Sequence, residues 1–288
     1  MPMKKSVINV KAEKVKKAVR TRYGEIAKHN TSCCPSANSS CCGNTSVQEI
    51  SKKIGYTEKE LNTVPKDSNL GLGCGNPIAL ASLKKGETVL DLGSGAGFDC
   101  FLAANRIGKT GKVIGIDMTA EMIEKARENA KKNNYRNIEF RLAEIENLPV
   151  ANNSVDVIIS NCVINLALDK ERVFKEAFRV LKPGGRIMIS DIVLLKKLPD
   201  SIKKSVAAYV GCVAGASMKE KYVQLIKSAG FKKVKILEET NYPIEFVIDN
   251  PEAKPIIDRL NISPSKIKKL INSVASIKIL GIKPNKQS

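Results

Sequence analysis

The chain of 288 residues contains no tryptophan, a single histidine and only 5% aromatic residues. A nucleic-acid-binding protein is expected to combine clustered basic residues with aromatic side chains on which bases stack. Here the formal charge of +19 is carried mainly by lysines that are spread over the whole chain. We therefore attribute this charge to a solvated lysine-rich surface and expect no nucleic-acid partner.

Long apolar runs are also missing from the sequence. The N-terminal segment Met1–Lys5 leads into a mixed polar stretch without the apolar core of a signal peptide, and no later segment is long enough to span a bilayer. We expect a cytoplasmic protein without a membrane partner, and a monomer. With 43% hydrophobic residues, the chain is long enough to bury a full core.

Cysteine is better represented, with eight residues. A reducing compartment disfavours structural disulfides in a domain of this size. A structural zinc site is also disfavoured, because the chain has neither a C-x-x-C pair nor a second histidine beside His29. We place Cys100 in the core, on the apolar face of a helix. The cysteines stand at positions 33, 34, 41, 42, 74, 100, 162 and 212.

Strand and helix patterns alternate along the middle of the chain, which predicts a doubly wound, mostly parallel α/β sheet of seven strands. An amphipathic helix is expected over residues 7–29, followed by a mobile loop over 31–46 that carries two cysteine pairs. A glycine-rich turn at 182–185 precedes the fifth strand. The predicted strands are 88–92, 112–117, 138–142, 154–160, 186–191, 234–237 and 276–282, and the predicted helices between them are 98–106, 120–133, 169–180 and 218–229.

A glycine loop follows the first predicted strand, in the order Gly93-Ser94-Gly95-Ala96-Gly97. Its glycines permit a tight turn, and the helix after them presents free N–H groups to a ligand. Asp117 ends the second strand, about 20 residues later, where a carboxylate can accept both hydroxyls of a ribose. The acidic segment Glu144–Glu146 after the third strand and the turn at 182–185 favour S-adenosylmethionine over a dinucleotide.

These features, in this order, resemble the class I S-adenosylmethionine-dependent methyltransferases over roughly residues 85–240. The resemblance implies that the loop from Gly93 to Gly97, including Ser94 and Gly95, holds the methionine part of the cofactor. It also implies that Asp117 binds the ribose and that Met118 contacts an adenine face. Ile145 and Glu146 would then bind the adenine edge, and Asn161 is assigned to the cofactor site as well.

Thiols lie near the same end of the predicted sheet. Cys162 follows the fourth strand, Cys74 lies in a glycine-rich loop and Cys212 lies among small residues. Because ligands of open α/β sheets bind at the carboxyl ends of the strands, all three side chains can reach one site. Sulfur ligands select soft, thiophilic ions.

The segments Gly73–Gly75, Asp99–Cys100, Gly115–Thr119 and Ser160–Leu166 resemble the arsenite methyltransferase family, and the similarity covers most of the chain. In that family, cysteine thiolates hold trivalent arsenic, whose lone pair attacks the sulfonium methyl group. The resemblance implies that Cys74, Cys162 and Cys212 are the catalytic arsenic ligands. It also implies thiol–disulfide cycling by an N-terminal cysteine, for which the candidates are Cys33, Cys34, Cys41 and Cys42. Before Cys212, this chain has Gly211 where many members have glutamate.

The sequence thus predicts an arsenite methyltransferase of arsenic detoxification, which acts on a thiol adduct of trivalent arsenic. S-adenosylmethionine would be the methyl donor, and glutathione or thioredoxin the thiol reductant. Three parts are expected: an N-terminal helical extension (1–70), a methyltransferase core (71–240) and a C-terminal segment with the last strand (241–288). Two alternatives stay open, a class I methyltransferase of a small organic metabolite and a thiol-rich metalloid-binding protein without turnover.

Overall fold

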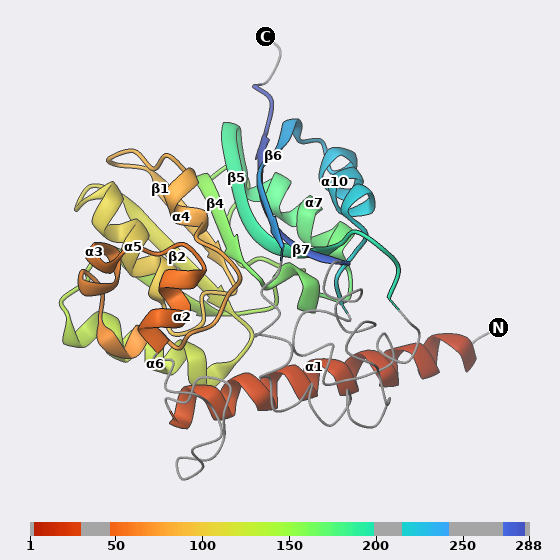
Figure 1. The fold of residues 1–288 in the computed structure, drawn as a ribbon, viewed down its shortest axis with the longest axis horizontal. Coiled ribbons are helices and arrows are strands. Elements are labelled where there is room, and N and C mark those ends of the chain that lie inside the picture. Colours follow the sequence, from red (N-terminus) through yellow and green to blue (C-terminus); the bar gives the residue numbers. More distant parts are fainter. Residues whose placement is uncertain (1–2, 30–46, 199–214, 242–272, 286–288) are drawn as a thin grey trace.

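The computed structural model describes residues 3–29, 47–198, 215–241 and 273–285. A seven-stranded sheet forms its centre, in the order β3-β2-β1-β4-β5-β7-β6 (Figure 1). Strand β7 pairs antiparallel with both of its neighbours, and the other strand pairs are parallel. The predicted doubly wound, mostly parallel sheet is therefore confirmed. The strands are β1 (Thr88–Leu92), β2 (Lys112–Asp117), β3 (Ile138–Leu142), β4 (Val155–Asn161), β5 (Leu181–Leu194), β6 (Lys232–Asn241) and β7 (Val274–Ile282).

Successive residues of the inner strands pack into two different hydrophobic clusters, one on each face of the sheet. Leu90 and Ile114 belong to the cluster that includes side chains of α7 and α10. Their neighbours Val89 and Val113 belong to the cluster that includes side chains of α4, α5 and α6. This alternation follows from the two-residue period of a strand, and it explains why these strands are almost continuously apolar. The helices are α4 (Pro77–Leu80), α5 (Phe98–Ile107), α6 (Ala120–Lys132), α7 (Lys170–Val180) and α10 (Lys219–Ser228).

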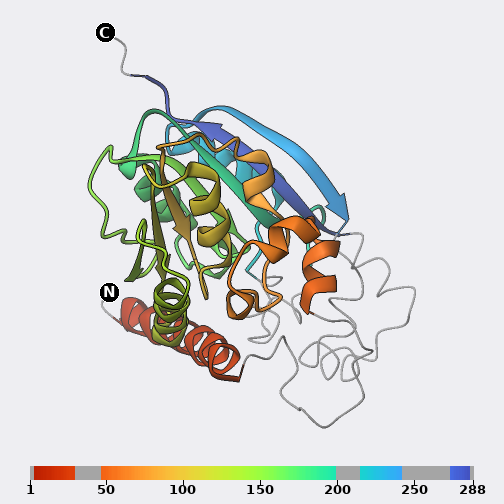
Figure 2. The same ribbon diagram turned by 90° about the vertical axis from the view of Figure 1, so that its left-hand side faces the viewer.

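Helix α1 (Met3–His29) lies across one end of the sheet, beneath the strands in both views (Figure 1, Figure 2). Val19 is buried in a cluster with residues that follow β2 and β4, among them Met118 and Cys162. Ile26 is buried against Ala96 of the glycine loop. Helix α1 therefore covers the end of the sheet at which its parallel strands finish.

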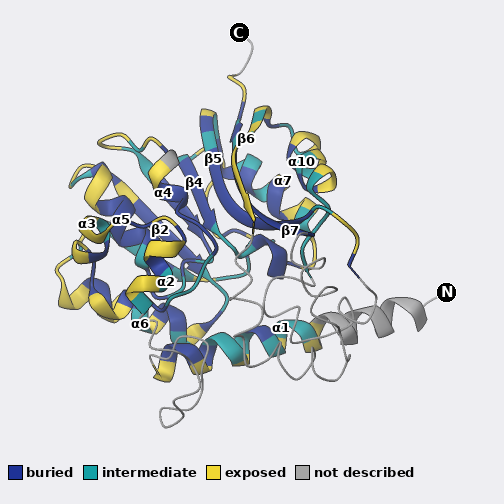
Figure 3. Ribbon diagram, in the orientation of Figure 1, coloured by how far each residue is buried: buried dark blue, intermediate teal, exposed yellow. Residues whose placement is uncertain are grey.

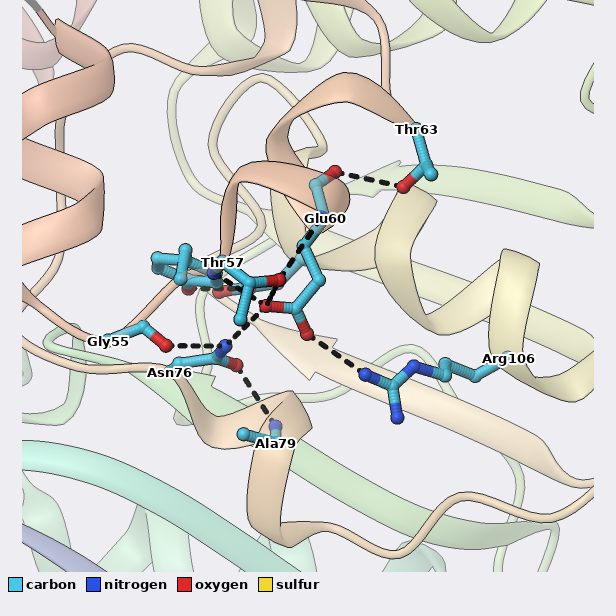
Figure 4. Close-up of polar contacts among 9 residues, drawn as sticks. Gly55, Thr57, Glu60, Thr63, Asn76, Ala79 and Arg106 are labelled. Carbon is cyan, nitrogen blue, oxygen red and sulfur yellow. Dashed lines mark hydrogen bonds and ion pairs between the residues drawn. The ribbon is translucent and has the colours of Figure 1, made fainter.

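The short helix α2 (Val47–Lys53) is followed by Gly55 and by a second short helix, α3 (Glu58–Asn62). A polar network connects Gly55 and α3 with the start of α4 and with Arg106 of α5 (Figure 4). Thr57 and Glu60 form a reciprocal capping box at the start of α3. The buried side chain of Asn76 caps α4 by accepting from the N–H of Ala79 at 3.0 Å, and it donates to the carbonyl of Gly55 at 3.2 Å. Because Asn76 closely follows Cys74, this network fixes one end of the Cys74 loop.

Burial differs strongly between the centre and the edge of the sheet (Figure 3). Strands β1, β4 and β5 are almost entirely buried, whereas most residues of the edge strand β6 are exposed. Lysines and glutamates dominate β6, which protects an edge strand against pairing with another chain. Within the described residues, no helix is long and apolar enough to cross a membrane.

Two predicted strands have wrong boundaries, and helix α1 begins at Met3, four residues before its predicted start at residue 7. The turn expected at 182–185 is included in β5, which begins at Leu181 and pairs there with Val155, with a register shift before the next paired residues. Strand β6 is longer than its apolar stretch because it pairs with β7 as far as Asn241. The loop expected at 31–46 lies outside the described residues, and the division of the chain at residues 70 and 240 stays a prediction.

Candidate functional site

The glycine loop connects β1 with α5 in a tight turn. The N–H groups of Gly93 and Ser94 both donate to the carbonyl of Ile116, at 2.7 and 2.9 Å. Gly93, Gly95 and Gly97 have positive φ values, which residues other than glycine rarely adopt. A Cβ atom at Gly93 would also overlap the side chain of Val163. The loop therefore needs glycine for its backbone conformation and for its close packing.

The carboxylate of Asp117 lies directly beside this loop. It accepts from the N–H of Gly95 at 3.0 Å and from the N–H of Thr119 at 2.9 Å. Desolvation raises the pKa of Asp117, although these backbone donors act in the opposite direction. The Oγ of Ser94 is buried and has no hydrogen-bond partner among the described residues. Such a loop, with an unsatisfied hydroxyl and a carboxylate that has lone pairs left, fits a ligand with an amino-acid part and a ribose.

Of the residues expected at the adenine, Met118 packs beside helix α1. Met118 packs in the same cluster as Val19, and Ile145 is buried. Glu146 accepts from the N–H of Leu168 at 3.2 Å. Its neighbour Glu144 forms ion pairs with two residues of α1, with Lys16 at 2.5 Å and Arg20 at 2.7 Å. The roles of Met118, Ile145 and Glu146 in cofactor binding stay predictions.

Two of the three predicted arsenic ligands meet in the structure. Sγ of Cys74, Sγ of Cys162 and a carboxylate oxygen of Asp191 all lie within 4.8 Å of one another. Cys74 precedes α4, Cys162 follows β4 and Asp191 belongs to β5. Cys74 is buried, and Cys162 is partly accessible. The expected third ligand Cys212 lies outside the described residues.

The backbone holds Cys162 in an unusual conformation. Its φ is +58°, a left-handed value that costs a non-glycine residue about 1–3 kcal/mol. The N–H of Cys162 donates to the carbonyl of Ser190 in β5 at 2.8 Å. This bond to the adjacent strand holds the turn in which the thiol leaves the end of β4. Strain at a reactive side chain is typical of functional sites.

Asn161 joins the Cys74 loop to the end of β4. Its Oδ1 accepts from the N–H of Cys74 at 3.0 Å, and its Nδ2 donates to the carbonyl of Gly75 at 2.7 Å. Nδ2 also lies 2.9 Å from the hydroxyl of Tyr56 and 3.2 Å from a carboxylate oxygen of Asp99. These contacts make Asn161 a positioning residue for Cys74, while its assignment to the cofactor site stays a prediction.

The sequence analysis missed Asp191 as a site residue. Its side chain is fully buried and accepts from the hydroxyl of Tyr222 at 2.9 Å, from Nδ2 of Asn165 at 2.8 Å and from the N–H of Ile192 at 2.9 Å. Desolvation raises the pKa of Asp191 to about 6 despite these donors. A signal was present, because an acid at the end of the predicted strand 186–191 follows the same strand-end rule as Cys162.

The remaining cysteines do not join this group within the described residues. Cys100 is fully buried in the core, as expected, and its thiol lies 3.2 Å from a carboxylate oxygen of Asp91. Burial and the neighbouring Asp91 raise the pKa of the Cys100 thiol well above its usual value, which makes it unreactive. The four N-terminal cysteines, Cys33, Cys34, Cys41 and Cys42, lie outside the described residues.

Comparisons with known proteins identify methyltransferases as relatives of this chain. An arsenite methyltransferase of Halobacterium salinarum is 48% identical over 243 residues, which cover 82% of this chain and 62% of that protein. A demethylmenaquinone methyltransferase of Lactococcus lactis is 33% identical over 67% of this chain and 79% of its own. Among solved structures, an arsenic (III) S-adenosylmethionine methyltransferase from Chlamydomonas reinhardtii has a TM-score of 0.59 and 29% identity, covering 82% of this chain and 73% of that chain.

The resemblance to arsenite methyltransferases is thus confirmed. The chain spans 62%, 63% and 58% of the length of three curated arsenite methyltransferases that it matches. A methyltransferase-domain family matches residues 83–230, which include the glycine loop, Asp117 and Cys162. This match covers half of the chain and coincides with most of the sheet. The chain therefore belongs to the methyltransferase-domain family and has the class I methyltransferase fold.

Proposed function

We propose that this protein transfers the methyl group of S-adenosylmethionine to trivalent arsenic and serves arsenic detoxification. The observation that carries the proposal is the convergence of Cys74 and Cys162 at the end of the sheet where the glycine loop also lies. Two thiols from segments far apart in the sequence are brought together by Asn161 and by the strained turn at Cys162. A methyltransferase of an organic metabolite would not need this arrangement.

The chemistry of the donor set supports a soft substrate. Thiolates bind soft ions in preference to hard ones, and trivalent arsenic keeps a lone pair when sulfur ligands hold it. Such an atom is itself the nucleophile, so the protein needs no general base to activate it. The task left to Cys74 and Cys162 is to orient the lone pair. Cys212, which the family resemblance implies as the third ligand, is part of the proposal.

The glycine loop supports S-adenosylmethionine as the donor. When bound, this cofactor supplies a methyl group activated by a sulfonium. We assign the hydroxyl of Ser94 to its amino-acid part, and Asp117 to its ribose. Helix α1 packs on Met118 and covers this end of the sheet, which limits access of water to the reacting groups.

Further parts of the proposal concern its partners. The substrate would arrive as a thiol adduct, and a thiol reductant such as glutathione or thioredoxin would regenerate the N-terminal cysteines. The same proposal includes a monomeric protein in the cytoplasm. The family resemblance supports these parts.

The test is incubation of the full-length protein with arsenite, glutathione and labelled S-adenosylmethionine, followed by arsenic speciation. Cys74→Ser and Cys162→Ser are expected to lower the yield of methylated arsenic at least about 100-fold, because oxygen is a poor ligand for a soft ion. The matched control is Cys100→Ser, whose hydroxyl can replace the thiol beside Asp91. It is expected to retain wild-type turnover.

Two outcomes contradict the proposal. The first is a wild-type protein that binds S-adenosylmethionine and yields no methylated arsenic. The second is a Cys162→Ser variant that methylates arsenite at the wild-type rate. Binding of S-adenosylhomocysteine by each variant, measured by calorimetry, shows whether the cofactor site is intact.

A further inference from the structure

We propose that the carboxylate of Asp191 stabilises the positive charge that develops on arsenic during methyl transfer. This inference rests on the proposed function and adds to the cysteines a residue with a different role. Its geometric basis is that a carboxylate oxygen of Asp191 lies within 4.8 Å of both Sγ atoms, those of Cys74 and Cys162. In the described residues, no other group of three such side chains comes together in this way. An arsenic atom held by the two sulfurs is therefore a near neighbour of this carboxylate.

The environment of Asp191 consists of hydrogen-bond donors. Tyr222 and the N–H of Ile192 each donate to it, and so does Nδ2 of Asn165. The amide orientation of Asn165 is fixed, because Nδ2 also donates to the carbonyl of Ile192 at 2.6 Å. None of the ion pairs within the described residues involves Asp191. Besides these donors, the positive charge of Lys170 acts on Asp191 and lowers its pKa, and the carboxylate faces the two thiols.

A buried carboxylate without an ion-pair partner is costly, which calls for an explanation. A purely structural role is served as well by an uncharged side chain that accepts and donates hydrogen bonds. A cationic neighbour that exists only during the reaction explains the charge better. Buried charges of this kind are preorganised, so they require no reorientation when the reaction occurs.

The electron balance of the methyl transfer shows where such a neighbour forms. The arsenic lone pair makes the new As–C bond while the C–S bond of the sulfonium breaks, and the electron pair of that bond stays on sulfur. Arsenic is oxidised from the trivalent to the pentavalent state, and the methyl carbon is formally reduced. Positive charge therefore leaves the sulfonium and appears on arsenic, beside Asp191. The step needs no proton and no further oxidant.

The electrostatic effect favours the transition state over the ground state only because arsenic is the atom nearest to the carboxylate. Cys74 and Cys162 would fix arsenic at this side of the site, whereas the glycine loop would hold the donor at the end of β1. A charge that moves toward Asp191 during the reaction is stabilised increasingly as the reaction proceeds. Asp191 is thus expected to affect kcat and to have little effect on substrate binding.

Asp191→Asn, Asp191→Glu and Tyr222→Phe, made in the full-length protein, test this proposal with arsenite, glutathione and S-adenosylmethionine. Asp191→Asn is expected to lower kcat about 100-fold, the loss typical of one preorganised electrostatic group. KM for arsenite, protection of thiols by arsenite and affinity for S-adenosylhomocysteine are expected to stay within about threefold. Asp191→Glu keeps the charge at a shifted position, and its kcat is expected to fall about tenfold with unchanged arsenite binding.

Tyr222→Phe is the matched control, because it removes one donor and keeps the carboxyl group. Since loss of this donor raises the pKa of Asp191, all variants are assayed at about pH 9, where the carboxylate is ionised. Its kcat is expected to stay within about threefold of the wild type. Equal losses of kcat in Asp191→Asn and Tyr222→Phe would overturn the proposal, since disturbed packing would then explain both losses. An arsenite affinity that falls in parallel with kcat in Asp191→Asn would overturn it too, because Asp191 would then be an arsenic ligand.

The outcome stays decisive in two further cases. If Asp191→Asn does not fold, Asp191→Glu carries the test, and an arsenite affinity that falls in parallel with its kcat overturns the proposal. The wild-type protein in the same assay separates the two levels of the argument. Absence of arsenite methylation in the wild type contradicts the proposed function, whereas methylation that is unaffected by Asp191→Asn contradicts the role of Asp191 alone.

Discussion

At Gly73 and Gly75 the backbone of the Cys74 loop lies close to neighbouring strands, and this helps to determine where the Cys74 thiol lies. A Cβ atom at Gly75 would overlap Oγ of Ser190, and one at Gly73 would lie 2.7 Å from Nδ2 of Asn161. The glycines on either side of Cys74 therefore let its loop approach β5 and the end of β4. The position of Cys74 depends on these absent side chains as much as on the bonds made by Asn161.

This packing gives a prediction for Gly75→Ala. The added methyl group has to displace Ser190 or the Cys74 loop, so the free energy of unfolding is expected to fall by about 1–3 kcal/mol. Arsenite affinity is expected to fall as well, because the Cys74 thiol moves away from Cys162. Urea denaturation and thiol protection by arsenite measure the two effects.

Ser190→Ala provides the control for this prediction. Its Oγ is buried without a partner among the described residues, so the substitution alone is expected to leave stability almost unchanged. The double variant Gly75→Ala/Ser190→Ala is expected to recover part of the lost stability, because the overlap with Oγ is removed. The recovery is only partial, because the Cβ of residue 190 still lies 3.1 Å from the added methyl group. A Gly75→Ala protein as stable as the wild type would contradict the packing argument.

At the same scale, the sequence predicts the thiols and leaves out what holds them. Cys74 and Cys162 can be selected because cysteine has a distinct chemistry and a strand end has a known direction. Asn161 and Asp191 are polar residues in apolar surroundings, and many such residues only complete a hydrogen-bond network. The bond from Asn161 to the N–H of Cys74 joins residues 87 positions apart, which no local pattern can show.

At the scale of helices and strands, the sequence does not predict how helix α1 contacts the candidate site. Its amphipathic pattern predicts the helix itself, and its end at His29 agrees with that pattern. The surface that it covers depends on tertiary contacts of Val19 with Met118 and of Lys16 and Arg20 with Glu144. Helix α1 therefore packs against residues expected to hold the cofactor.

Glu144→Gln tests this attachment, because it removes both ion pairs at once. The side chain of Glu144 is about one-third exposed (32%), so the loss of stability is expected to be at most about 1 kcal/mol. Hydrogen exchange in residues 13–29 is expected to accelerate, because local opening of α1 becomes easier. Wild-type exchange should accelerate likewise at high salt.

The matched control is Glu128→Gln, which removes an exposed ion pair with Lys132 on α6. Exchange in α1 is expected to stay at the wild-type rate in this variant. Equal exchange rates in Glu144→Gln and the wild type would show that apolar contacts alone hold α1 in place.

The strands are the elements that the sequence predicts best, since five of them read as short apolar runs at the expected positions. The errors in strand boundaries occur where hydrogen-bond pairing with another strand, and not the amino-acid composition, determines where a strand begins. Leu181 pairs with Val155, and the N–H of Gly184 donates to the carbonyl of Lys283, so the apparent turn belongs to the sheet. Those partners lie 26 and 99 positions away and cannot be inferred from the turn residues (181 − 155 = 26 and 283 − 184 = 99).

For the whole molecule, the concentration of buried acids beneath the site affects stability. Burial raises the pKa values of Asp91, Asp99, Asp117 and Asp191. For Asp99, desolvation raises the pKa from 3.8 to about 6, although Tyr56 and Asn161 donate to its carboxylate. Between these values, the folded protein binds more protons than the unfolded chain. The contribution of Asp99 to stability therefore falls as the pH rises from about 4 to about 6.

Asp99→Asn removes this titration and gives a prediction. The variant loses stability at every pH, because the carboxylate's bonds to Tyr56 and Asn161 are altered. Its deficit relative to the wild type is nevertheless expected to shrink between pH 4 and pH 7, since only the wild type has to ionise a buried acid. Urea denaturation at several pH values measures the difference, and a constant deficit would contradict the pKa assignment.

At the scale of the whole molecule, the doubly wound, mostly parallel fold class could be predicted, because alternating apolar runs and amphipathic helices leave few ways to build a sheet. The place of Cys162 at the end of β4 follows from that fold class, whereas the place of Cys74 depends on the contacts of its loop. The third thiol, Cys212, and the N-terminal cysteines lie outside the described residues, so their part in the account rests on the family resemblance.

The central claim is that sulfur atoms of Cys74 and Cys162 bind trivalent arsenic at the donor site. X-ray absorption at the arsenic K-edge, on the full-length protein with one equivalent of arsenite, tests this claim directly. The account predicts a shell of sulfur neighbours that persists in Cys100→Ser and is lost in the double variant Cys74→Ser/Cys162→Ser. A sulfur shell that survives in the double variant, or oxygen neighbours alone in the wild type, would contradict it.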